Sequence, residues 1–139
     1  MKLDARLSEL GHRFADREAA HRDELARARE CAAELHQRIA SGLESFHAAA
    51  GEDDPQLRLG LSDPRVDDKH LHSVQFELVR GRNRAIVTVK SRGEITLVGP
   101  FRQGKTEGPC RTFSIAAADA IDDALEAFLV AFIEEALAP

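Results

Sequence analysis

Apolar side chains recur every three or four residues along the first third of the chain. They stand at Leu3, Leu7, Leu10, Phe14, Leu25, Ala28, Ala32, Leu35, Ile39, Leu43 and Phe46. This spacing gathers them on one side of an α-helix in a heptad-like stripe. No proline precedes Pro55, so the pattern predicts one long helix over residues 1–50. The polar residues Arg17 and His21 interrupt the apolar stripe, and we expect any break in the helix near residues 15–21.

The length of this helix bears on its environment. About 45 helical residues extend about 68 Å at 1.5 Å each, whereas a compact chain of this size is only about 37 Å across. An unbroken helix must therefore project or pair with another chain. We expect self-association as a coiled-coil homodimer. The predicted contact residues are Leu25, Ala28, Ala32, Leu35 and Ile39. The alternative is that the stripe covers the chain's own sheet.

Alternating apolar and polar residues follow between residues 57 and 115. Runs at 57–61, 74–79, 85–90, 94–98 and 110–115 are separated by short turns or a loop. This arrangement predicts an antiparallel β-meander of four to five strands. One face of the predicted sheet is apolar, and the other mixes aliphatic with polar side chains. We expect the long helix or a partner to cover part of the mixed face.

A second amphipathic helix is predicted over residues 117–137. Its apolar side chains recur at three- and four-residue spacing from Ile121 to Ile133. We expect this helix to pack on the apolar face of the sheet. The prediction is thus an α+β fold in two parts. Residues 1–50 form the association helix, and residues 51–139 form an α+β domain with a meander (57–115) and a helix (117–137).

Composition limits the class of protein. The 139 residues suffice for one domain, and 43% hydrophobic with 31% charged residues is the usual balance of a soluble globular chain. No run of about 18 apolar residues exists, so we expect no membrane span. The first residues lack the apolar core of a signal peptide, which favours a cytoplasmic protein. Cys31 and Cys110 are expected to be unpaired, inert thiols.

Charge is segregated along the chain. The net charge is −5, yet residues 80–111 carry eight basic and two acidic groups, and residues 112–139 carry six acidic and no basic groups. The basic segment offers an alternative function, the binding of nucleic acid or another polyanion. The candidate anion-binding residues are Arg102, Lys105 and Arg111, with Arg82 and Arg84 as a second cluster.

The order helix, meander, helix resembles that of the YbaB-type nucleoid-associated proteins. This resemblance implies a role in nucleic-acid binding, and it transfers no residue role because it rests on element order alone. The absence of Trp and Tyr and the overall acidity count against a stacking-based nucleic-acid site.

Residues 99–106 read GPFRQGKT and match the phosphate-binding P-loop pattern. A P-loop presents the amides of a helix N-terminus to phosphate. Here Gly108 and Pro109 would end a helix within its first turn. We interpret the match as accidental and expect no ATP hydrolysis.

Other candidate chemistry is sparse. His70 and His72, near Asp67 and Asp68, could approach a zinc ion, but two histidines fall short of a zinc-site pattern. No nucleophile motif occurs. We therefore assign no catalytic residue, metal or cofactor. The predicted function is a small non-enzymatic interaction module whose partner is a second copy of itself or another protein.

Overall fold

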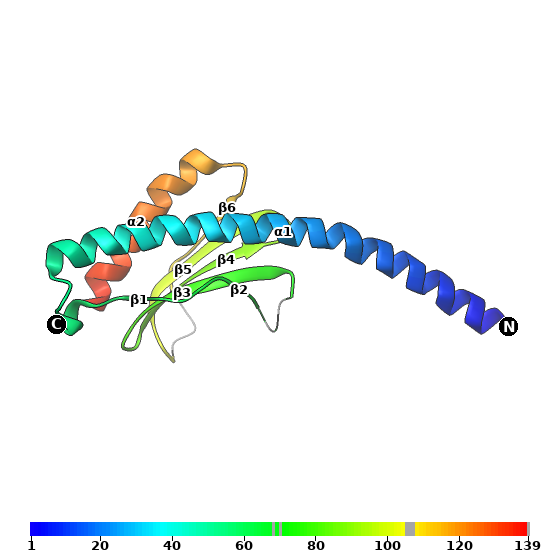
Figure 1. The fold of residues 1–139 in the computed structure, drawn as a ribbon, viewed down its shortest axis with the longest axis horizontal. Coiled ribbons are helices and arrows are strands. Elements are labelled where there is room, and N and C mark those ends of the chain that lie inside the picture. The colour runs from blue at the N-terminus through cyan, green and yellow to red at the C-terminus, as the bar shows by residue number, and fades with distance from the viewer. Residues whose placement is uncertain (68, 70, 105–107, 139) are drawn as a thin grey trace.

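The computed structural model describes residues 1–67, 69, 71–104 and 108–138 (Figure 1). Within them the chain forms two α-helices and one antiparallel sheet, which confirms the predicted α+β fold. The elements are α1 (Lys2–Ala50), the 3₁₀ turn η1 (Pro55–Leu57), β1 (Gly60–Leu61), β2 (Arg65–Val66), β3 (Ser73–Arg80), β4 (Asn83–Lys90), β5 (Glu94–Arg102), β6 (Cys110–Ser114) and α2 (Ala118–Ala136). The sheet has six strands rather than four to five, because β1 and β2 are two-residue additions beside β3.

Helix α1 runs without interruption from Lys2 to Ala50, and it does not break near residues 15–21, where the sequence most favours a break (Figure 1). Polar residues at the lapse are compatible with a helix, because they change which side chains face a neighbour and leave the backbone hydrogen bonds intact. Gly51 ends the helix with a φ of 112°, and its N–H donates to the carbonyl of His47 at 2.9 Å.

The strands follow the order β1-β3-β4-β5-β6, each antiparallel to its neighbour. The register pairs Phe76 with Val87, Val87 with Leu97, and Ile95 with Phe113. Because side chains alternate across a strand, this register places the apolar residues of four strands on one face.

Both helices pack on that apolar face. Helix α1 contacts β3 and β4, and α2 contacts β4, β5 and β6. Phe76 from β3, Ile39 from α1 and Phe132 from α2 are all buried in the same core. The expectation that α1 covers the mixed face is therefore corrected. That face, with Ile86 and Thr96 partly exposed, is covered by neither helix in the described part of the chain.

Among the described residues, no helix is both long enough and apolar enough to span a bilayer. The division of the chain into an association helix and a domain from residue 51 stays a prediction. The structure shows one core to which both parts contribute.

Candidate functional site

Helix α1 has two halves with different surroundings. From His21 onward one side of the helix lies against the sheet. Its sheet-facing residues are Ala28, Ala32, Leu35, Ile39 and Leu43. Four of the five predicted contact residues belong to this set, and each is at most 3% exposed within a single chain. Leu25, the fifth, is partly buried against the same core. This placement differs from the expected one, because these side chains already cover the chain's own sheet.

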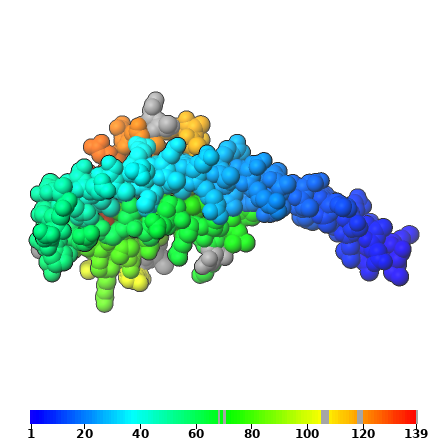
Figure 2. Space-filling model, viewed as in Figure 1, coloured from blue at the N-terminus to red at the C-terminus, as the bar shows by residue number. Residues whose placement is uncertain are grey.

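The other half of α1 projects beyond the sheet. Figures 1 and 2 show it, in blue, extending clear of the rest of the chain. We call residues 2–20 the arm. Every residue of the arm is exposed except Leu10, which is partly exposed. Leu3, Leu7 and Phe14 are 61%, 56% and 53% exposed. The arm thus presents large apolar side chains to solvent.

These side chains form a stripe, which we define as Leu3, Leu7, Leu10 and Phe14. With 3.6 residues per turn, the stripe points within roughly 20° of the direction of the sheet-facing residues. One continuous apolar side therefore runs along α1. The sheet covers its second half, and no other described part of the chain covers its first half.

The two halves meet where His21 contacts His72. Their ring centroids lie 3.9 Å apart with an interplanar angle of 73°, and the two Nδ1 atoms are 3.3 Å apart. Glu24 approaches His21, with 3.9 Å between Oε2 and Nδ1. The lapse in the apolar pattern therefore marks the end of the sheet under α1 rather than the end of a helix.

The histidine pair does not extend to a metal centre within the residues described. No group of three or more His, Cys, Asp or Glu side chains among them could hold an ion. Asp68 and His70, named above as candidate ligands, lie outside the described residues.

Three of the five candidate anion-binding residues lie at one end of the sheet. Asn83 pairs with Arg102, the carbonyl of Arg82 accepts from the N–H of Gln103 at 2.7 Å, and Arg84 Nη2 lies 3.4 Å from Gln103 Oε1. The backbones of Arg82, Arg84 and Arg102 thus lie close together at the β3–β4 turn and the end of β5. Arg102 shares the sheet face of Asn83, whereas Arg84, the next residue along β4, lies on the opposite face.

The other two candidates do not join this group in the structure. Arg111 pairs with Leu97, which places it on the helix-covered face, and its guanidinium lies 5.0 Å from the ring centroid of Phe113. Lys105 lies outside the described residues.

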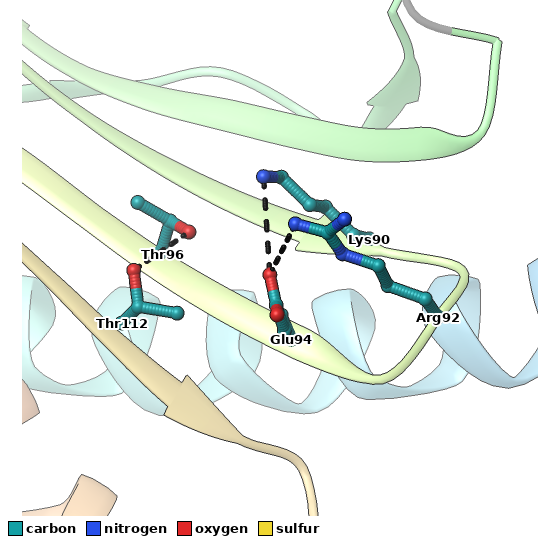
Figure 3. Close-up of polar contacts among 5 residues, drawn as sticks. All are labelled: Lys90, Arg92, Glu94, Thr96 and Thr112. Atoms are coloured by element: carbon teal, nitrogen blue, oxygen red, sulfur yellow. Dashed lines mark hydrogen bonds and ion pairs between the residues drawn. The ribbon is translucent and has the colours of Figure 1, made fainter.

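Further cations of the basic segment already have partners. Arg92 Nη2 lies 2.7 Å from Glu94 Oε2, and Lys90 Nζ lies 3.9 Å from the same oxygen (Figure 3). Arg80 donates to the carbonyls of Gln56 and Ala136. The described cations of residues 80–111 therefore divide between both faces and both ends of the sheet.

The P-loop-like segment begins inside a strand. Gly99, Pro100, Phe101 and Arg102 belong to β5, and the next strand, β6, pairs antiparallel with β5. The N–H of Gly99 donates to the carbonyl of Pro109 at 2.7 Å. A P-loop instead connects a strand to a helix. Lys105 and Thr106 lie outside the described residues.

The predicted contact residues lie in the second half of α1, where the sheet buries four of them, and the prediction did not include the arm. The available signal was the lapse at Arg17 and His21, which separates the stripe from the sheet-facing residues.

Comparison of the chain with family models, curated proteins and solved structures finds no match.

Proposed function

We propose that this protein is a non-enzymatic interaction module that self-associates through the arm of α1. The observation that carries the proposal is the exposed stripe on a helix whose same side is buried wherever the sheet reaches it. An amphipathic helix gains stability when its apolar side packs on another element. The arm therefore requires a second element on which its apolar side can pack.

A second copy supplies a matching surface. The stripe has the 4-3-4 spacing of heptad core positions, and two such stripes interlock as knobs into holes. The arm carries four basic and four acidic residues, so its net charge is zero and two arms do not repel each other. This balance also separates the arm from helices that lie on anionic membranes, whose polar side is rich in Lys and Arg.

The energetics favour a weak, reversible pair. Full burial of a Leu or Phe side chain contributes about 1.5–3 kcal/mol. Three of the four stripe residues are more than half exposed and Leu10 is partly exposed, so burial of all eight from two arms contributes roughly 8 kcal/mol on that scale. Association costs about 4–15 kcal/mol in lost freedom of motion. At the low end of that cost, about 4 kcal/mol remains in favour of association, so we expect a weak dimer with a dissociation constant of about 1 mM.

Light scattering over concentrations from well below to above about 1 mM tests the proposal. Leu7→Asp places a charge in the stripe and should hold the protein monomeric, because an unpaired charge is costly to bury. Ala5→Asp is the matched control, since residue 5 lies on the opposite side of the arm, and it should dimerise like the unaltered chain. A monomeric mass for the unaltered chain at every concentration would contradict the proposal.

A second function, binding of nucleic acid or another polyanion, is supported by Arg82 and Arg84, which lie in and directly after the β3–β4 turn, both near Gln103. Gel-shift titration against salt tests it, because binding to phosphates weakens steeply as salt rises. Replacing Arg82 and Arg84 with Ser should abolish the shift, and replacing Arg92, at the other end of the sheet, should preserve it. No shift at low salt would exclude this function.

A further inference from the structure

We infer that the two arms pair antiparallel, with Leu3 of one copy against Phe14 of the other and Leu7 against Leu10. The two sheets then lie at opposite ends of an elongated dimer. This inference rests on the proposed function and adds the orientation and register of the pair.

The position of the sheet excludes the parallel orientation. The stripe and the sheet-facing residues lie on the same side of α1, so the side that meets the partner arm also carries the sheet. In a parallel pair, both sheets would lie between the two helices from His21 onward. Packed helices are about 8–10 Å apart, whereas two intervening sheets would force the axes roughly 30 Å apart, at about 10 Å for each layer. The arms could not touch.

An antiparallel pair removes this conflict. Each arm extends toward the other copy's sheet. It packs on the same side of that copy's α1 as the sheet does, but on the turns that precede the sheet. The sheet begins at the His21–His72 contact, and this contact limits how far along α1 the partner arm can extend. The partner arm must therefore fit alongside residues that precede His21.

One register satisfies this limit and pairs the whole stripe. Antiparallel helices pack core positions of the two heptad types against each other. Pairing Leu3 with Phe14 and Leu7 with Leu10 gives four apolar layers. Met1 of the second copy then lies opposite Asp16, about 8 Å before His21 at 1.5 Å per residue.

The neighbouring registers fail for different reasons. A shift of seven residues toward the sheet places Met1 of the second copy opposite Asp23, past His21 and into the end of the sheet. A shift of seven residues away leaves Leu10 and Phe14 without partners.

Charges beside the stripe act against this orientation but weakly. Antiparallel pairing brings Arg6 of one arm near Arg13 of the other, whereas parallel pairing would bring Arg13 near Glu18. Exposed charge pairs contribute little. Arg13 also has Glu9 and Asp16 one turn away on its own helix. The steric conflict between the two sheets in a parallel pair, rather than charge, therefore decides the orientation.

Small-angle scattering of the dimer distinguishes the two orientations. The antiparallel pair separates the two copies of Ala50 by about 125 Å, whereas a parallel pair is no longer than one α1 helix, about 75 Å. We expect a maximum dimension of at least about 125 Å at a dimeric mass. A dimeric mass with a maximum dimension near 80 Å would overturn the orientation and leave self-association intact.

Cysteine cross-linking tests the register. In a chain carrying Cys31→Ala and Cys110→Ser, either Leu3→Cys or Phe14→Cys alone should form no disulfide dimer, because equivalent residues are about 16 Å apart along the axis. Mixing the two proteins should give a disulfide-linked heterodimer. Self-linking of either single variant, or a dimer in which the mixture fails to link, overturns the inference. A monomeric mass throughout overturns the proposed function itself.

Discussion

Arg80 Nη1 donates a hydrogen bond to the carbonyl oxygen of Ala136 at 2.5 Å, which joins the end of β3 to the last turn of α2. Its Nε donates to the carbonyl of Gln56 at 3.1 Å. The last carbonyls of a helix lack partners within the helix, and a cation near them is favourable. Helix α2 has no basic residue in its last turn. The sheet therefore supplies the cation that the helix lacks.

Arg80→Met should lower the free energy of unfolding by about 2 kcal/mol, because it removes charge-assisted hydrogen bonds and leaves the partly buried carbonyl of Ala136 without this donor. Urea denaturation measures the change. Arg82→Met is the control, since Arg82 is exposed in the adjacent turn, and its effect should stay within about 0.5 kcal/mol. Equal effects of the two substitutions would show that the Arg80 contacts do not stabilise the fold.

Substitutions in the two halves of α1 should differ sharply. Ile39→Ala creates a cavity in the core and should cost about 2–5 kcal/mol of unfolding free energy. Leu7→Ala, measured at concentrations where the chain is monomeric, should change that free energy by less than about 0.5 kcal/mol. A large loss of monomer stability on Leu7→Ala would mean that the stripe packs within the same chain.

Gly99 should tolerate replacement less well than Gly93. Both have positive φ, 113° and 97°. A Cβ at Gly99 would also lie 3.0 Å from the Cα of Ala85 and from the carbonyl oxygen of Arg84, whereas a Cβ at Gly93 meets nothing within 4 Å. Gly93→Ala should cost about 1–2 kcal/mol from the backbone alone. Gly99→Ala should cost about 1–3 kcal/mol more, as overpacking does. Thermal or urea unfolding of both variants checks the difference.

The two cysteines should react differently. Burial, and then the nearby Glu34 carboxylate, raise the pKa of the Cys31 thiol, whereas Cys110 is exposed. Iodoacetamide should therefore modify Cys110 first, as mass mapping of the alkylated peptides would show. Faster labelling of Cys31 would contradict this placement of the thiol.

The raised pKa of the Cys31 thiol also predicts how the stability of the fold changes with pH. A thiol whose pKa is higher in the folded chain stabilises the fold fully at pH values below its unfolded pKa, and that contribution is lost as pH rises through the folded pKa. Stability should therefore fall above about pH 8.5. It should fall less in Cys31→Ala than in the unaltered chain when urea unfolding is compared at pH 7.5 and 9.5.

The order and type of the main elements were predictable because each is encoded locally. Period-two alternation around β3, β4 and β5 and the short turns between them specify a meander without knowledge of its neighbours. Periodicity does not reveal which element covers an apolar side. The sequence patterns of Leu7 and Leu35 are alike, yet one faces solvent and the other faces the sheet.

The candidate basic site shows the same limit. Arg80 finds its partners at Gln56 and Ala136, which lie 24 and 56 residues away along the chain. Such distant pairing leaves no local signal, so a count of charges overestimates how many cations remain available. The pair Arg92 and Glu94, two residues apart, was the part that sequence could suggest.

The uninterrupted path of α1 has a dynamic consequence. Residues 21–50, held on the sheet, keep the helix nucleated, so the arm can lose helical turns only from the end remote from the sheet. Amide exchange in the monomer should slow progressively from Leu3 toward His21. A partner that binds near Leu3 must therefore order the turns it contacts, and its binding would be read out as slower exchange along the whole arm while the sheet stays unchanged.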